Sequence, residues 1–254
     1  MYKIYPKSFF VGQNIKYLPS CQSTNDEAAQ LIAQHDPAEG TIVITDRQTA
    51  GRGQRGNHWE ASAGQNLTFS LIVRPTFLNA SEQFWLNTAV SLGIFDTLSP
   101  LLGDGLRIKW PNDIYVEKQK LGGILIENIL QGYNLAWSVA GIGLNINQTE
   151  FMYSTATSLQ RQVPLPSGYD LPGLLAQLCE KLEQRYLQLR AGQRATLRAA
   201  YLQTLFRYQE EHWFSANQES FRGLITGIDE AGRLAIAVDG RIRYFGFKEV
   251  EFIL

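Results

Sequence analysis

Apolar, β-branched runs follow one another closely between Leu106 and Ile142, with short turns between several of them. They cover residues 106–109, 114–116, 121–129 and 135–142. The first turn holds Pro111 and an Asn-Asp pair, which are typical turn residues. Strands joined by tight turns pair antiparallel, whereas parallel strands need long crossovers. This stretch therefore predicts a mixed or largely antiparallel sheet in an α+β protein.

The flanking segments predict further strands and four helices. Apolar runs at 15–18, 41–45 and 67–73 are typical of strands. Amphipathic or capped segments at 24–35, 81–98, 171–189 and 194–207 are typical of helices. Thr24 and Glu27 have the spacing of a capping box at the start of the first helix.

The last forty residues change character. Short strand patterns at 221–228, 233–238 and 241–245 are joined by turn residues, among them the hairpin pair Asp239-Gly240. Such a series predicts a small β-barrel. We therefore expect two domains, a larger one over residues 1–214 and the barrel over residues 215–254.

Composition excludes several classes of protein. A formal net charge of −1 argues against a general nucleic-acid binder, which usually carries a basic surplus. Two distant cysteines and three scattered histidines match no disulfide or zinc pattern. The amino-terminal residues lack an export signal, and no apolar run is long enough for a membrane span. We expect a cytoplasmic protein.

A glycine- and arginine-rich segment, Gln48 to Trp59, joins two of the predicted strands. Its glycines allow close approach of a ligand to the backbone, and Arg52 and Arg55 add positive charge. The glycine spacing fits G-x-G-x-x-G, but the segment that follows is too short and too polar to form the phosphate-binding helix of a Rossmann site. A nucleotide site and a solvated glycine-rich hairpin both remain open on this segment alone.

Three further segments point to an anionic ligand. Residues 109–113, Lys-Trp-Pro-Asn-Asp, offer oxygen ligands of the kind that suit Mg²⁺ carrying phosphates. Residues 120–123, Lys-Leu-Gly-Gly, place a cation beside open backbone, and residues 141–147 place glycines at a strand end. Each segment alone is more typical of structure than of function, but four at strand ends of one sheet favour a site. Catalysis there would depend on positioning and charge stabilisation.

These segments, with Ser23-Thr24-Asn25, occur in the order and spacing found in biotin protein ligases, which the chain resembles over residues 15 to 147. The resemblance implies a catalytic domain similar to class II aminoacyl-tRNA synthetases, followed by an SH3-like barrel. It also implies the reaction. Biotin and ATP give biotinyl-5′-adenylate, which then acylates a lysine of a biotin carboxyl carrier protein, with Mg²⁺ as the metal.

The resemblance also implies roles for individual residues. Ser23, Thr24 and Gln48 should bind the biotin head group, beside the Gly51 backbone, and Gly123 and Gly141 should form the floor beneath biotin. Arg52, Lys120 and the Mg²⁺-linked Asp113 should be catalytic, while Trp59 and Asn145 should contact the nucleotide. The remaining expected ligand-binding residues are Asn25, Gln54, Arg55, Asn112, Gly122 and Gly143.

Two features separate this chain from better-known relatives. Gln54 stands where their loop reads Gly-Arg-Gly-Arg, so we expect a weaker hold on the anionic adenylate. Too few residues precede Ser23 for a helix-turn-helix, so we expect a ligase without a repressor role, acting as a monomer or homodimer. The alternatives are a lipoate or octanoate attachment enzyme and a non-enzymatic biotin or nucleotide binder.

Overall fold

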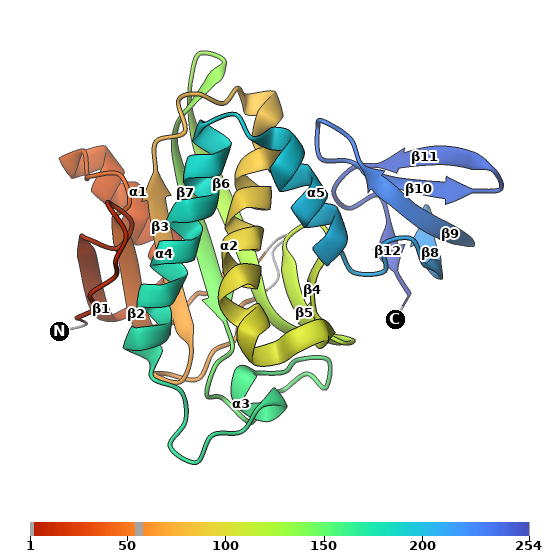
Figure 1. Cartoon of the computed structure of the whole chain (residues 1–254). Helices are drawn as coiled ribbons and strands as arrows, with labels where there is room; N and C mark the ends of the chain where they lie inside the picture. Colours follow the sequence, from red (N-terminus) through yellow and green to blue (C-terminus); the bar gives the residue numbers. More distant parts are fainter. Residues whose placement is uncertain (1–2, 54–57, 254) are drawn as a thin grey trace.

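The computed structural model describes residues 3–53 and 58–253. Its main feature is a seven-stranded sheet with the order β1-β2-β3-β7-β6-β5-β4 (Figure 1). The strands are β1 (Ile15–Cys21), β2 (Ile42–Gln48), β3 (Leu67–Val73), β4 (Leu106–Lys109), β5 (Asp113–Val116), β6 (Gln119–Gln131) and β7 (Asn134–Leu144). Only the β1–β2 pair in this sheet is parallel, so the predicted mixed, largely antiparallel sheet is confirmed.

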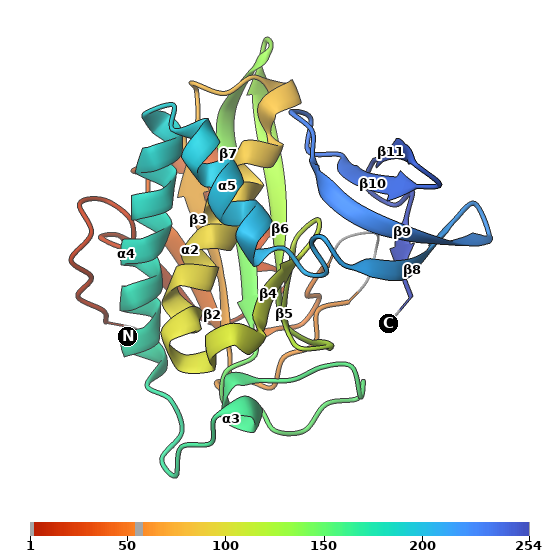
Figure 2. The same cartoon turned by 45° about the vertical axis from the view of Figure 1, so that its right-hand side comes forward.

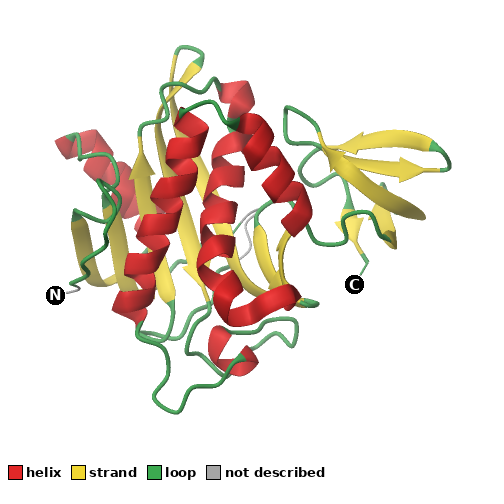
Figure 3. Ribbon diagram, viewed as in Figure 1, coloured by secondary structure: helices red, strands yellow, loops and turns green. Residues whose placement is uncertain are grey.

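Helices cover both faces of this sheet, and strand alternation decides which side chain meets which helix. Ile42 and Ile44 belong to the large core formed with helices α2 (Phe84–Leu102), α4 (Leu171–Arg190) and α5 (Arg194–Thr204), which lie over one face in Figure 3. Val43, between them, belongs to a smaller cluster with Ala28 of α1 (Thr24–His35) on the opposite face. Because helices cover both faces of the sheet, every residue of strand β3 is buried.

Three helix predictions need correction at their ends. The capping box at Thr24 and Glu27 is wrong, because Ser23 is the N-cap residue and the Thr24 hydroxyl bonds elsewhere. The second helix begins at Phe84 because Asn79 and Glu82 cap a separate 3-10 turn, Ala80–Glu82. The last helix stops at Thr204 because Leu205 bridges to Ile108 of β4.

A second, five-stranded antiparallel sheet follows, with the order β11-β10-β9-β8-β12. Its strands are β8 (Glu211–Ala216), β9 (Glu219–Ile228), β10 (Leu234–Val238), β11 (Arg241–Phe245) and β12 (Glu251–Phe252). The Asp239-Gly240 hairpin is confirmed, with positive φ at both residues. The sheet begins at Glu211, so the boundary expected at residue 215 falls inside β8. Neither β8 nor β12 was anticipated from the sequence, and the same holds for the short helix α3 (Leu159–Gln162).

Figure 2 shows the second sheet beside strands β4 and β5 of the first, and aromatic contacts join the two. The Trp110 indole, in the β4–β5 turn, donates a hydrogen bond of 2.9 Å to the Gly232 carbonyl in the β9–β10 turn. Phe247 packs against Trp110 and Phe84, with ring centroids 5.4 and 6.0 Å apart. The β4–β5 turn, which holds Asn112 and Asp113, is therefore fixed from the side of the second sheet.

A buried carboxylate holds the amino-terminal segment against α4. Glu183 is 4% exposed, and its oxygens accept the backbone N–H groups of Phe9, Phe10 and Val11 at 2.7, 2.7 and 3.0 Å. The segment leading into β1 thus depends on one side chain far along the chain.

No helix within the described ranges is long and apolar enough to cross a membrane.

Candidate active site

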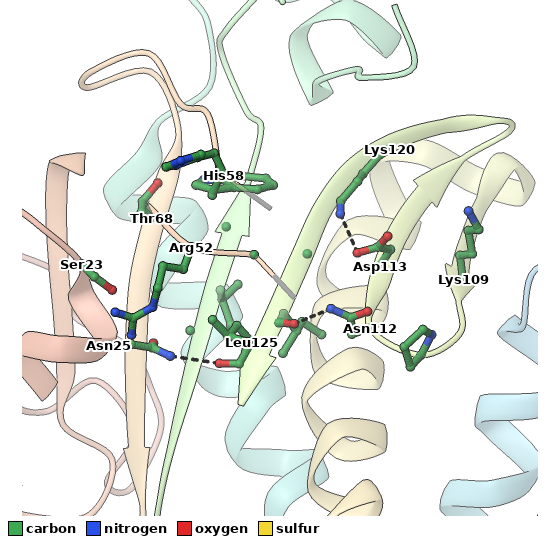
Figure 4. A pocket seen from close by; sticks show the side chains of 18 of the residues that line it. Ser23, Asn25, Arg52, His58, Thr68, Lys109, Asn112, Asp113, Lys120 and Leu125 are labelled. Atoms are coloured by element: carbon green, nitrogen blue, oxygen red, sulfur yellow. Dashed lines mark hydrogen bonds and ion pairs between the residues drawn. The ribbon is translucent and has the colours of Figure 1, made fainter. Parts of the chain in front are cut away.

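A cleft of about 390 Å³ lies where strand ends of the large sheet meet the start of α1 and the second sheet. It collects residues from every segment that the sequence analysis singled out. The lining includes Ser23, Thr24, Asn25, Gln48, Arg52, Trp59, Asn112, Asp113, Lys120, Gly123, Gly141 and Gly143 from the predicted set. Figure 4 shows the polar side chains converging on this space.

A hydrogen-bonded network fixes the start of α1. The Thr24 backbone N–H and hydroxyl both donate to Gln48 Oε1, at 2.7 and 3.1 Å. The Ser70 hydroxyl lies 2.8 Å from Thr24 Oγ1 and 2.7 Å from Asn25 Oδ1. Asn25 in turn donates to the Leu125 carbonyl and, at 2.6 Å, to Glu127. This end of the cleft therefore presents buried polar groups in fixed orientations, which suits a small polar ligand.

Arg52 is held by two carboxylates. Its guanidinium makes a bidentate pair with Asp26 at 2.7 and 2.8 Å, and Glu127 lies 3.3 Å away. The hydrogen bonds to Asp26, followed by the charge of Glu127, raise the pKa of Arg52. The predicted binding cation is thus oriented before any ligand arrives, by two acidic side chains that the sequence analysis missed. Neither lies near Arg52 in sequence, so no local pattern could have indicated them.

Lys120 reaches across from β6 to Asp113 of β5, with Nζ and Oδ1 2.7 Å apart (Figure 4). Asn112 donates to the Ile124 carbonyl at 2.6 Å, which fixes the turn beside them. The predicted catalytic lysine and the predicted metal-binding carboxylate therefore form one ion pair in the cleft. Within residues 3–53 and 58–253, no group of three histidine, cysteine or acidic side chains could hold a metal.

Two glycines of β7 make room for other groups in the cleft. A Cβ at Gly141 would overlap the Asn25 amide, and one at Gly143 would overlap the Trp59 ring. Trp59 therefore lies directly on the strand. Its ring edge occupies the space that the side chain of any larger residue at position 143 would need. Both glycines are required by close packing and not by backbone conformation.

Trp59 Nε1 and Asn145 Oδ1 are two of the four buried side-chain atoms that lack a hydrogen-bond partner among the described residues. Asn145 is 4% exposed, and its amide nitrogen donates to the Thr157 carbonyl at 3.0 Å, which leaves its oxygen as the free group. A buried polar atom without a partner is costly, and a bound ligand is one way to satisfy it.

Several predicted residues do not line the cleft. Gly51, Gly122 and Asn145 lie outside its lining, although Gly51 packs against Gln48 and Trp59, and Gly122 against the Gly143 carbonyl. Gln54 and Arg55 lie outside the described residues, so their roles stay predictions. The cleft also holds residues that the analysis did not select, namely Gly53, His58, Thr68, Lys109, Trp110, Pro111, Ile124, Leu125, Ile142, Val250, Glu251 and Phe252.

The chain is similar in sequence and in fold to known proteins. Residues 17–145 match the Biotin/lipoate A/B protein ligase family. The biotin–[acetyl-CoA-carboxylase] ligase of Mycobacterium tuberculosis is 32% identical over 86% of this chain and 81% of its own length. The bifunctional ligase/repressor BirA of Bacillus spizizenii is 33% identical over 71% of this chain, which spans 56% of that relative.

Among solved structures, the biotin protein ligase from Aquifex aeolicus in complex with biotin and ATP has a similar fold. Its TM-score is 0.77 at 23% identity, over 94% of this chain and 98% of that one.

Proposed function

The chain belongs to the Biotin/lipoate A/B protein ligase family, and we propose that its cleft makes biotinyl-5′-adenylate from biotin and ATP. The enzyme then transfers biotin to a lysine of a biotin carboxyl carrier protein. The observation that carries the proposal is the continuity of a buried polar end, built by Ser23 to Asn25, with a cationic middle at Arg52 and Lys120.

The polar end suits the ureido group of biotin. Ser23, Thr24 and Gln48 offer hydroxyl and amide groups, and Asn25 is fixed by Glu127 and the Leu125 carbonyl. Gly141 and Gly123 add no side chain beneath the fused ring system of biotin. Since hydrogen bonds already hold these groups in place, ligand binding costs little side-chain entropy.

The middle of the cleft suits phosphoryl chemistry. Arg52 would hold the biotin carboxylate against the α-phosphate, and Lys120 would stabilise the charge that develops at phosphorus. A Mg²⁺ ion bound mainly by phosphate oxygens needs one or two protein carboxylates, and Asp113 supplies one that lines the cleft. Such an ion would neutralise phosphate charge, while Lys120 would turn from Asp113 toward the reacting group.

The nucleotide side is the stretch around Trp59, Gly143 and Asn145. Asn145 Oδ1 is a buried acceptor without a partner among the described residues, and the adenine amino group is a donor of matching chemistry. The Trp59 ring supplies a flat apolar wall. Asn112 and Gly122 support the turn and strand that carry Asp113 and Lys120, and Gln54 and Arg55 complete the proposed binding loop.

The finer architecture belongs to the same proposal. The large sheet with its helices corresponds to a class II synthetase-like catalytic domain over residues 1–214. The five-stranded sheet corresponds to the SH3-like barrel expected over residues 215–254, and its first strand, β8, begins four residues before that boundary, at Glu211. We propose a cytoplasmic monomer or homodimer that does not act on nucleic acid or membranes.

Biotin-dependent exchange between ATP and labelled pyrophosphate tests the first reaction, with lipoate and octanoate as competing substrates. We expect exchange with biotin and none with the two fatty acids. Exchange with lipoate alone would favour the alternative attachment enzyme, and biotin binding without exchange would favour a non-enzymatic binder. Transfer is then followed as labelled biotin on a purified carrier domain.

A further inference from the structure

Lys109 differs from Arg52 and Lys120, the other cations of the cleft, because it has no acidic partner among the described residues. Arg52 is paired with Asp26 and Glu127, and Lys120 is paired with Asp113. Lys109 lines the same cleft, yet no carboxylate among the described residues lies within ion-pairing distance of its amine. In Figure 4 it stands on the far side of Asp113 and Lys120 from Arg52.

The surroundings of Lys109 are aromatic. Its amine donates to the Tyr115 hydroxyl at 3.2 Å and lies 4.6 and 5.2 Å from the ring centroids of Tyr115 and Phe252. Burial raises the pKa of Tyr115, so the phenol is neutral and does not cancel the lysine charge. Phe252 belongs to β12, so the second sheet contributes one wall of this place.

Positive charge is in surplus there. Burial lowers the pKa of Lys109 most, and the nearby charges of Lys120 and Arg207 lower it further, while Asp113 opposes them. Arg207 is 7% exposed and donates to the Ile253 carbonyl at 2.9 Å. Glu251, the other acidic residue of the lining, is exposed. Asp113 is paired with Lys120, and Glu210 acts on Arg207, so the charge of Lys109 is the one left to attract an anionic ligand.

We propose that Lys109, with Tyr115 and Phe252, forms a subsite for the two terminal phosphates of ATP and for the pyrophosphate that leaves. This rests on the proposed function. A biotin carboxylate oxygen attacks the α-phosphorus and forms a P–O bond, while the bond from that phosphorus to the bridging oxygen breaks. The electron pair goes to pyrophosphate, which remains next to Lys109. The order Arg52, Lys120, Lys109 across the cleft thus follows the order carboxylate, α-phosphate, leaving group.

The test variant is Lys109→Met, which keeps the stem between Tyr115 and Phe252 but removes the charge. Lys109→Arg keeps the charge, and Lys118→Met is the matched control because Lys118 is an exposed lysine on the β5–β6 turn. The probes are inorganic pyrophosphate, as an inhibitor of adenylate formation, and chemically prepared biotinyl-adenylate, as a donor to the carrier protein.

For Lys109→Met we expect the KM for ATP and the inhibition constant for pyrophosphate to rise about tenfold. Biotin binding without ATP, and transfer from prepared biotinyl-adenylate, should stay at wild-type values, since neither involves the terminal phosphates. Lys109→Arg should keep most of the pyrophosphate inhibition, and Lys118→Met should match wild type. If Lys109→Met does not fold, Lys109→Gln provides the same comparison.

Unchanged pyrophosphate inhibition in a folded Lys109→Met variant would overturn the inference. So would slower transfer from prepared adenylate with normal pyrophosphate inhibition, because Lys109 would then act on the carrier. An inactive wild-type enzyme in biotin-dependent exchange would instead overturn the proposed function. The two failures are therefore distinguishable.

Discussion

At the scale of single residues, the ion pair of Lys120 with Asp113 leads to a prediction for catalysis and another for stability. We predict that Lys120→Ala slows adenylate formation by about 10²–10³, the usual cost of losing one positioned charge-stabilising group. The melting temperature should change little, because the pair with Asp113 is partly exposed and such pairs contribute about 1 kcal/mol or less. Single-turnover adenylate formation and thermal melting measure the two effects, and Lys118→Ala is the control. Near-normal turnover in the variant would remove Lys120 from the chemistry.

For Glu127 we expect a substitution to strengthen ligand binding, whereas the Lys120 substitution weakens catalysis. Its carboxylate lies 3.3 Å from Arg52, so it competes with any incoming anion for the same guanidinium. Glu127→Gln keeps an acceptor for Asn25 but removes the charge. We expect biotin and its adenylate to bind about fivefold more tightly, from roughly 1 kcal/mol of removed repulsion. Isothermal titration against the exposed control Glu150→Gln measures this, and weaker binding would mean that Glu127 mainly positions Asn25.

Sequence reasoning succeeded where the chemistry sits in short contiguous motifs. Twelve predicted residues line the cleft, because the five short motifs that carry them come together around it. It missed Glu127 and Ser70, which are separated from Arg52 and Thr24 by 75 and 46 residues. A pairing of that kind depends on strand register, which no local pattern encodes.

At the scale of elements, the attachment of the amino-terminal segment depends on Glu183. We predict that Glu183→Ala destabilises the protein by about 3 kcal/mol, because three backbone N–H groups lose their acceptor and the segment near Val11 is buried. Urea unfolding measures the change. Glu180→Ala is the matched control, since Glu180 lies on the same helix and accepts one exposed N–H, from Lys7. Equal losses for both variants would contradict a special role for Glu183.

Glu82 connects the 3-10 turn to α5 and should make stability depend on pH. The Arg194 guanidinium, and then the Asn79 backbone N–H, lower the pKa of Glu82. A lowered pKa stabilises the fold above the unfolded value of about 4.3, and this contribution is lost as the pH falls through the folded pKa. Glu82→Gln should therefore be less stable at neutral pH, by about 1 kcal/mol or less, and similar to wild type near pH 3. Urea midpoints at both pH values test this, and a pH-independent difference would exclude the ion pair as its cause.

Element prediction was accurate where local patterns decide and inaccurate where distant contacts do. The end of the first helix at His35 was predicted correctly, and so were both ends of β3. The helix at 194–207 was predicted too long because Leu205 is drawn out of the helix by β4, a contact across 97 residues. The two-residue strand β12 exists only because it pairs with β8, so its sequence alone gives no period to detect.

At the scale of the whole molecule, Gly232 should couple the second sheet to the cleft. Its carbonyl accepts from Trp110, and its φ of +82° together with a Cβ in the space of Phe84 makes Gly232→Ala doubly unfavourable. Gly240→Ala is the matched control, with φ of +76° and no described atom within 4 Å of the new Cβ. We expect Gly232→Ala to lose more stability and more adenylate formation than the control. Equal activity in the two variants would mean that the second sheet does not position the β4–β5 turn.

The pairing of Arg52 and Lys120 with acidic side chains has a consequence for how the cleft discriminates among solutes. Binding an anion there exchanges one counter-charge for another and releases few dissolved ions, so the affinity for biotinyl-adenylate should vary little with ionic strength. A site of bare cations would attract every abundant polyphosphate and nucleic acid of the cell. At Arg52 and Lys120 the acidic residues of the protein itself compete, so only a ligand that also fits the polar end and the Trp59 wall repays their displacement, and Lys109 alone is left to a polyphosphate.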